Sequence, residues 1–145
     1  MFSRRLCLPV LVQTALGLSL TALGPIFTPV QAEEQQRPEF GVLQSTELNA
    51  MLQKKDFFFV NVHIPYQGEI RDTDAFIPYD KIAASLDKLP KDKNTPIVLY
   101  CLGGGMSEIA AQKLVQLGYT RVSHLSGGMF DWKKRGYSVI NKSQQ

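Results

Sequence analysis

The chain has 145 residues, of which 44% are hydrophobic and 20% are charged, and its formal net charge is +3. This length suffices for one domain with a hydrophobic core, and the composition is that of a globular protein rather than a disordered one. The small net charge gives no support to nucleic-acid binding.

The first segment of the chain has the pattern of a secretory signal peptide. Arginines at positions 4–5 precede an uncharged, largely apolar run over residues 6–27, and Val-Gln-Ala at residues 30–32 fits a cleavage site. We expect a signal peptide over residues 1–32 and a flexible leader over residues 33–40. The chain is then exported, to the periplasm or another extracytoplasmic compartment. An uncleaved signal is the alternative and would be the only contact with a membrane.

Cleavage after residue 32 changes both the charge and the cysteine content. It removes two arginines and no acidic residue, so the net charge falls from +3 to +1. It also removes Cys7, which leaves Cys101 without a partner for an internal disulfide. An unpaired cysteine in an oxidising compartment favours a reactive role, although a buried inert thiol fits the same count.

Short predicted elements alternate through the first half of the mature chain. A strand is expected over residues 41–43 and a helix over about residues 45–54. Aromatic and β-branched side chains over residues 57–62 predict a strand that is buried on both faces. Asn61 and His63 therefore lie at the carboxyl end of this strand.

A polar loop and a helix are expected next. The loop covers residues 71–74, and the helix covers about residues 80–86 with Pro78 near its start. Charged residues 90–94 connect this helix to the following strand.

The central stretch of the chain is a strand that ends on a cysteine. Residues 97–100 form a short apolar run bounded by proline and glycine, which predicts a buried strand with Cys101 at its carboxyl end. Ser107 is expected to be the N-cap of a helix that runs to about Leu117 and ends at Gly118.

This placement makes Cys101 the candidate catalytic residue. Ligands of open α/β sheets bind beyond the carboxyl ends of the strands. Glycines let successive N–H groups point at one spot, and the N-terminus of a helix adds partial positive charge there. A thiol held at that spot ionises more readily, and the thiolate is the nucleophilic form. The expected active-site loop is Leu102, Gly103, Gly104, Gly105, Met106 and Ser107.

The last predicted elements complete an alternating pattern. A strand over residues 121–125 is followed by a helix over residues 129–135, with Phe130 and Trp132 as expected core anchors and Gly136 at its end. The order of strands and helices predicts an α/β sandwich with a mostly parallel sheet.

Three stretches of the chain together resemble the motifs of one family. A strand over residues 58–64 leads into Gly-Glu-Ile at residues 68–70, and a six-residue loop over residues 101–106 follows the central strand. A Gly-Gly pair, a tryptophan and a glycine then occur within residues 125–137. In this order and spacing the stretches resemble the signatures of the rhodanese-like domain, a family of single-domain sulfurtransferases.

The resemblance implies both a fold and an activity. The fold is a three-layer sandwich, with a mostly parallel central sheet flanked by helices, over residues 41–138, followed by a C-terminal tail over residues 139–145. The activity is sulfurtransfer, in which Cys101 takes sulfane sulfur from a small sulfur-containing anion or a persulfide donor. The resulting persulfide passes its sulfur to a nucleophilic acceptor, either a thiol or a protein. No cofactor, metal or nucleic acid is expected.

Several positions depart from the family's pattern. Leu102 and Met106 stand where family loops commonly carry a cation, so we expect a less charged donor than thiosulfate, such as a persulfide or polysulfide. Asn61 and His63 replace the usual Asp and Arg of the first signature, and we treat both as auxiliary candidates. His63 and His124 are each able to polarise the thiol or its acceptor, with His63 preferred, although structural histidines fit both positions.

The same residues admit other interpretations. Related phosphatases end their cysteine loop on arginine, but position 107 is serine, so phosphoryl charge would go uncompensated. A metal site built from Cys101, His63 and His124 has no paired ligand spacing to support it. The alternative function is a non-catalytic rhodanese-like module that binds through the same pocket, and a third is a thiol redox sensor.

Overall fold

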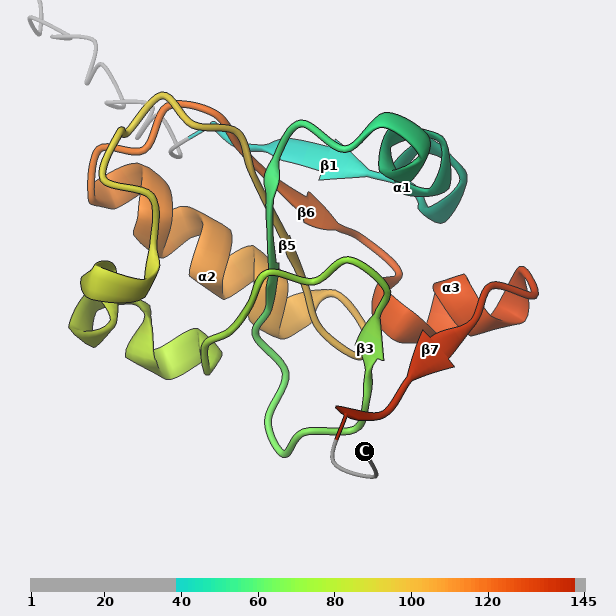
Figure 1. Ribbon diagram of the computed structural model, residues 1–145. Helices are drawn as coiled ribbons and strands as arrows, with labels where there is room; N and C mark the ends of the chain where they lie inside the picture. The colour runs from blue at the N-terminus through green and yellow to red at the C-terminus, as the bar shows by residue number, and fades with distance from the viewer. Residues whose placement is uncertain (1–38, 143–145) are drawn as a thin grey trace, which may run out of the picture. The chain divides into compact units, whose positions relative to one another are not determined.

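The computed structural model describes residues 39–142, so the predicted signal peptide (1–32) and most of the predicted leader (33–40) lie outside the described residues. A five-stranded sheet has the order β1-β6-β5-β2-β4, and every pairing within it is parallel (Figure 1). Its strands are β1 (Gly41–Leu43), β2 (Phe58–Asn61), β4 (Ala75–Phe76), β5 (Ile97–Tyr100) and β6 (Val122–Leu125). The strand that ends on the candidate cysteine, β5, is therefore central.

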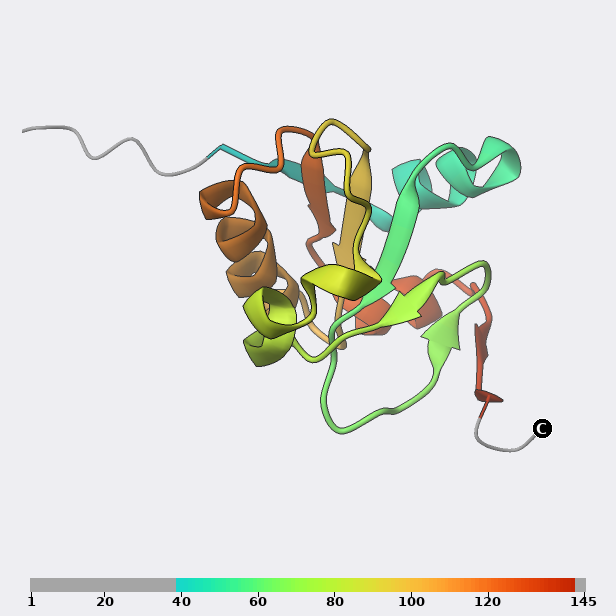
Figure 2. The same cartoon turned by 60° about the vertical axis from the view of Figure 1, so that its left-hand side comes forward.

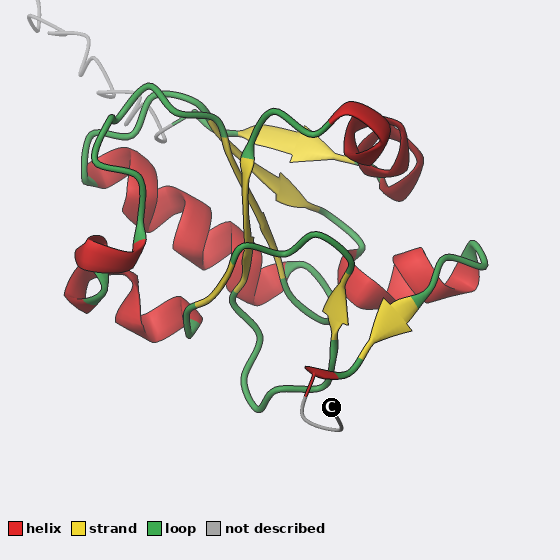
Figure 3. Ribbon diagram, viewed as in Figure 1, coloured by secondary structure: helices red, strands yellow, loops and turns green. Residues whose placement is uncertain are grey.

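Helices cover both faces of this sheet (Figures 2 and 3). The α-helices are α1 (Ser45–Met51), α2 (Gly105–Gln116) and α3 (Gly128–Lys134), and the 3-10 helices are η1 (Leu52–Lys54), η2 (Tyr79–Ala84) and η3 (Leu86–Lys88). Helix α2 and the turns η2 and η3 lie on one face, while α1 and α3 pack on the other. Parallel strands need crossover connections, and these connections cover both faces. The predicted three-layer α/β sandwich is confirmed.

Side chains along the central strand alternate between two hydrophobic clusters. Leu99 and Cys101 belong to the cluster beneath α2, whereas Val98 and Tyr100 belong to the cluster shared with α1 and α3. Successive side chains of a strand point to opposite faces, so this alternation follows from the two-residue period. The consequence for function is that Cys101 faces α2.

Two segments differ from the expectations. The helix expected over residues 80–86 is instead the 3-10 helices η2 and η3. The expected tail from residue 139 begins as strand β7 (Val139–Ile140), which pairs antiparallel with β3 (Glu69–Ile70). The two-residue strands, β4 included, are too short to show a hydrophobic period in the sequence.

Candidate active site

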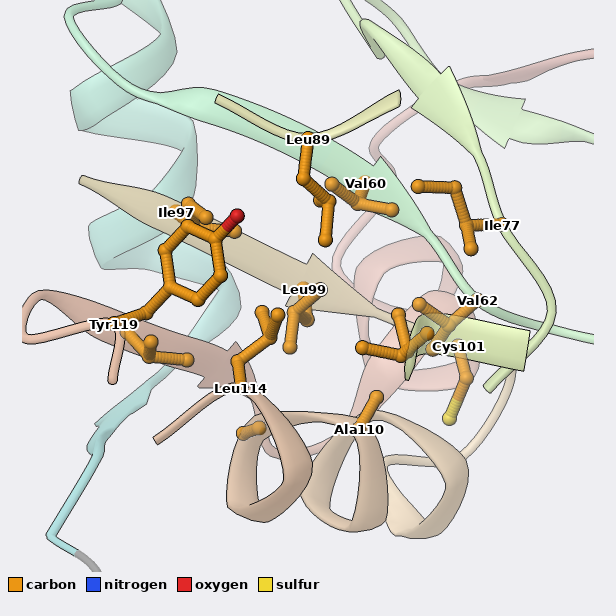
Figure 4. Packing of buried hydrophobic residues seen from close by; sticks show 13 residues of the cluster. Val60, Val62, Ile77, Leu89, Ile97, Leu99, Cys101, Ala110, Leu114 and Tyr119 are labelled. Atoms are coloured by element: carbon orange, nitrogen blue, oxygen red, sulfur yellow. The ribbon is translucent and has the colours of Figure 1, made fainter. Parts of the chain in front are cut away.

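The thiol of Cys101 lies directly after the central strand, in front of the first turn of α2. Figure 4 shows its side chain at the end of the hydrophobic cluster, next to the start of the helix that carries Ala110 and Leu114. The residue is 2% exposed. The N–H of Gly104 donates a hydrogen bond to its Sγ over 3.0 Å. At least one main-chain amide of the loop therefore points at the sulfur, as expected from the sequence.

The loop itself is shorter than expected, because α2 begins at Gly105 and Gly104 is its N-cap. The prediction of Ser107 as N-cap was wrong. Gly104 has φ 102°, a conformation that glycine adopts without strain, so the chain turns into the helix three residues earlier. Ser107 lies within the first turn, and its Oγ donates back to the Gly104 carbonyl over 2.8 Å. Gly105 and Met106 complete that first turn, whose amides have no acceptor within the helix.

The first turn of α3 holds the carbonyl groups of the loop. The N–H of Met129 donates to the carbonyl of Cys101 over 2.9 Å, and the N–H of Phe130 donates to that of Leu102 over 2.9 Å. A peptide group is planar and trans, so its N–H points opposite to its C=O. The N–H groups of Leu102 and Gly103 therefore point away from α3. The Gly-Gly, tryptophan and glycine motif of residues 125–137, the closing motif, thus orients the amides of the loop although it lies outside the loop.

Glycine is required where the loop and the closing motif meet. A Cβ on Gly104 would lie 1.9 Å from the carbonyl oxygen of Ser126, and one on Gly128 would lie 2.5 Å from the carbonyl oxygens of Cys101 and Leu102. No side chain fits at these distances, so the two segments can lie this close only because both positions are glycine.

The two aromatic residues of α3 have different roles. Trp132 is 2% exposed and donates from Nε1 to the Ser138 carbonyl over 3.0 Å, which confirms it as a core anchor. Phe130 is 62% exposed, so its prediction as a core anchor was wrong. Met129 and Trp132, three positions apart, occupy the buried face of the helix, and Phe130 falls outside that face. Its ring instead lies beside Gly103.

Asn61 holds the segment that follows β2. Its Nδ2 donates to the Gly68 carbonyl over 3.0 Å, and its Oδ1 accepts the N–H of His63 over 3.0 Å. Val60 and Val62 pack in the same cluster as Cys101, so Asn61 between them leaves β2 toward the opposite face. Both polar ends of Asn61 are therefore engaged in shaping the backbone.

His63 is buried without a polar partner. It is 6% exposed, and neither ring nitrogen has a hydrogen-bond partner among residues 39–142. Burial lowers the pKa of its ring. The preceding residue, Val62, donates its N–H to the Tyr100 carbonyl over 2.9 Å and so lies beside Cys101. His63 thus follows the strand end next to the thiol, with both nitrogens unused.

His124, the less favoured histidine of the sequence analysis, is linked to the loop. It lies on β6, next to the central strand, and is 5% exposed. Its Nδ1 is 3.2 Å from Oγ of Ser107, and its ring makes an edge contact with Phe40 at a centroid distance of 5.4 Å. Because Ser107 also contacts Gly104, the side chain of Ser107 connects His124 to the loop.

Three further observations concern metal binding, a surface hollow and membrane crossing. Within the described part of the chain, no three His, Cys, Asp or Glu side chains are grouped so as to hold a metal ion. A hollow of about 790 Å³ is lined by residues that include Phe57, Ile97 and Val122, at the amino ends of β2, β5 and β6. It lies at the edge of the sheet opposite to Cys101. Residues 39–142 include no helix of the length and hydropathy that a membrane crossing requires.

Comparison with known proteins gives relatives of more than one activity. A sulfurtransferase of Allochromatium vinosum is 33% identical over 89 residues, which are 59% of this chain and 80% of that protein. A tRNA uridine(34) hydroxylase of Erwinia tasmaniensis is 31% identical over 99 residues, which are 64% of this chain and 28% of the hydroxylase. The chain therefore matches little more than a quarter of the hydroxylase.

A solved structure shows the same fold. The rhodanese-like domain of an Anabaena protein superposes with a TM-score of 0.63 at 20% identity, covering 74% of this chain and 83% of that domain. The model of the rhodanese-like domain family matches residues 46–135, which contain the central strand, the cysteine loop and most of the closing motif. The chain belongs to the rhodanese-like domain family.

Proposed function

We propose that this protein is a sulfurtransferase that forms a persulfide on Cys101. The observation that carries the proposal is the hydrogen bond from the Gly104 N–H to Sγ, in front of the first turn of α2. The N-terminus of a helix carries partial positive charge, which favours a negatively charged sulfur. Thiolate and persulfide both carry that charge, so the same amides serve the nucleophile and the intermediate. The related sulfurtransferase of A. vinosum supports this proposal.

The reaction proceeds in two displacements. The Cys101 thiolate attacks the outer sulfur of the donor, and a new S–S bond forms as the donor's own S–S bond breaks. The bonding electron pair leaves with the remaining fragment, which is sulfite from thiosulfate or a thiolate from an organic persulfide. An acceptor thiolate then attacks the outer sulfur of the persulfide and takes it, and Cys101 departs as a thiolate. Neither displacement requires an external oxidant or reductant.

The loop favours a donor of low charge. Leu102 and Met106, at the positions where family loops commonly carry a cation, are half-buried apolar side chains. The exposed ring of Phe130 lies beside Gly103 on the same loop. A dianion would be stabilised by amides and the helix terminus alone. We therefore infer that a persulfide or polysulfide is used in preference to thiosulfate, with a thiol or a protein as acceptor.

Mass spectrometry of the purified mature protein tests the proposal. After incubation with polysulfide or an organic persulfide, the protein gains one sulfur atom, and a Cys101→Ser variant gains none. Added cyanide or a thiol removes the sulfur and restores the original mass. The absence of added sulfur with polysulfide, an organic persulfide and thiosulfate would contradict the proposal. Reversible sulfenylation without sulfur gain would identify a redox sensor instead.

One observation favours a second candidate function. Cys101 is only 2% exposed, so a donor reaches Sγ only if the loop or its neighbours move. A non-catalytic module that binds an anion or a partner in front of α2 needs no such movement. The rate of alkylation of Cys101 in the native protein separates the two. A rate no faster than global unfolding allows would support the binding module.

We also propose that the domain is exported, on the pattern of residues 1–32. Expression of the full chain in a Gram-negative host, followed by fractionation, is expected to yield a periplasmic form whose mass corresponds to a start at Glu33. Full-length protein in the cytoplasmic fraction would contradict this expectation. Full-length protein in the membrane fraction would indicate an uncleaved signal.

A further inference from the structure

A series of hydrogen bonds connects β6 to the cysteine loop. Nδ1 of His124 lies 3.2 Å from Oγ of Ser107, and this hydroxyl donates to the Gly104 carbonyl over 2.8 Å. The N–H of Glu108 donates to the same carbonyl over 3.0 Å. Ser107 is completely buried and His124 is 5% exposed, so neither contact is in free exchange with water. Two groups of α2 therefore bind one carbonyl of the loop, and His124 of β6 contacts one of these two groups.

The hydrogen bond from Ser107 to the Gly104 carbonyl decides the positions of the other protons in this series. The Ser107 hydroxyl has a single proton, which it donates to the Gly104 carbonyl, so Nδ1 of His124 must donate to Oγ. Burial lowers the pKa of His124, while the charge of Glu108 and the Gly104 carbonyl raise it. The ring of His124 also makes a T-shaped contact with the apolar ring of Phe40. At neutral pH the imidazole is therefore neutral, with its proton on Nδ1.

Gly104 is held at both of its polar groups. Its carbonyl is bound by Ser107 and Glu108, and its N–H donates to Sγ of Cys101 over 3.0 Å. Its φ is 102°, a value that only glycine adopts without strain. Glycine adopts many other φ values as readily, so the torsional preference of this residue does not fix the orientation of its peptide groups. The external hydrogen bonds have to select its orientation. In the following peptide group the N–H of Gly105 points opposite to the bound carbonyl, out of the helix end.

We propose that Ser107 and His124 are positioning residues for Cys101, which keep Gly104 oriented so that its N–H remains on the sulfur. The two side chains act through the backbone and touch neither donor nor acceptor. Their effect on the lifetime of a persulfide rests on the proposed function, but their effect on the ionisation of the thiol does not. The geometry thus predicts a change in thiol reactivity that is measurable without any sulfur donor.

Alkylation of Cys101 by iodoacetamide, measured against pH in the full mature protein, tests this role. The plateau rate at high pH reports access to the thiol, whereas the midpoint of the pH profile reports its ionisation. Ser107→Ala and His124→Leu are expected to move the midpoint up by about one pH unit, which lowers the rate below the midpoint about tenfold. Ser107→Thr retains the hydroxyl, and His124→Asn retains an N–H donor near the place of Nδ1. Both are expected to keep the midpoint within about 0.3 units, a twofold change in rate.

Tyr119→Phe is the matched control. It removes a part-buried side-chain hydrogen bond, from Tyr119 to the Pro90 carbonyl at 2.9 Å, that does not involve the loop. Its midpoint should equal that of the unmodified protein, and urea unfolding establishes that each variant is folded.

Equal midpoints in Ser107→Ala, His124→Leu and the unmodified protein would overturn the inference, and so would an equal shift in Tyr119→Phe. A shifted midpoint in a protein that never gains sulfur would uphold this inference and reject the proposed sulfurtransfer.

Discussion

Replacing Gly128 by alanine should detach α3 from the cysteine loop. The glycine has φ 55°, and a Cβ added to it would lie 2.5 Å from the carbonyl oxygens of Cys101 and Leu102. These are the oxygens that accept the N–H groups of Met129 and Phe130. The alanine methyl group and the two hydrogen bonds cannot both be accommodated. We expect the start of α3 to move away and both bonds to break.

The expected loss of stability has two parts. An alanine held at positive φ costs about 1–2 kcal/mol. Two lost hydrogen bonds add about 0.5–1.5 kcal/mol each. Gly128→Ala should therefore lower the free energy of unfolding by about 2–5 kcal/mol. Gly136→Ala is the matched control, because its φ is 81° and a Cβ there meets no atom within 4 Å. It should lose only the backbone part, about 1–2 kcal/mol.

Urea unfolding of the two variants and the unmodified protein measures both losses. Alkylation of Cys101 provides a second measurement, since Gly128→Ala should also raise the plateau rate by freeing the loop, whereas Gly136→Ala should not. The reasoning is refuted if the two variants are equally stable and equally reactive at Cys101. That result would mean that α3 does not hold the loop carbonyls.

Three further predictions concern charge and pH. Met106→Arg should raise kcat/KM for thiosulfate about tenfold or more, because a hydrogen bond to a charged group contributes about 1.5–3 kcal/mol. The neutral control Met106→Gln should leave kcat/KM unchanged. Equal kcat/KM values in the two variants would contradict the proposed reason for donor choice. Burial raises the pKa of Tyr100 above its usual value of 10.0. The unfolded chain therefore loses this proton at a lower pH than the folded chain. The free energy of unfolding should fall as the pH rises above about 10, by up to about 1.4 kcal/mol per pH unit. Urea unfolding of Tyr100→Phe should show a smaller dependence on pH. Burial lowers the pKa of His63 from 6.5, so the unfolded chain gains this proton first and stability should fall as the pH drops from about 7 to 5. His63→Leu should reduce that acid slope and raise stability at pH 7 by about 1 kcal/mol, since it removes buried polar atoms without partners; an unchanged slope would mean that the ring is not buried in its neutral form.

Local patterns in the sequence were sufficient for the main elements. The strand at residues 97–100 and the placement of Cys101 after it were predicted correctly, because an apolar β-branched run bounded by proline and glycine admits few alternatives. The helix ends at Gly118 and Gly136 were also predicted, and both glycines have positive φ. Glycine near the end of a helical pattern is a local signal that tertiary contacts rarely override.

Contacts between distant segments were beyond such patterns. Strand β7 exists because it pairs with β3, some seventy positions away by sequence number, and two residues carry no periodic signal. Ser107 looked like an N-cap because the sequence does not show which of three glycines takes a positive φ. Phe130 was predicted as a core residue because its side chain is apolar, but the direction of that side chain depends on where α3 packs.

The amino-acid sequence alone determined the order of the longer strands and the α-helices, the family and the thiol at the end of the central strand, since each depends on residues that are neighbours in the chain. Only the tertiary structure decided which groups orient the cysteine loop. The carbonyls of the cysteine loop are held by the first turn of α3 and by Ser107, and Ser107 is bound in turn by His124. These partners come from other elements, and the direction of a peptide group in a glycine loop depends on what binds it rather than on the loop's own residues.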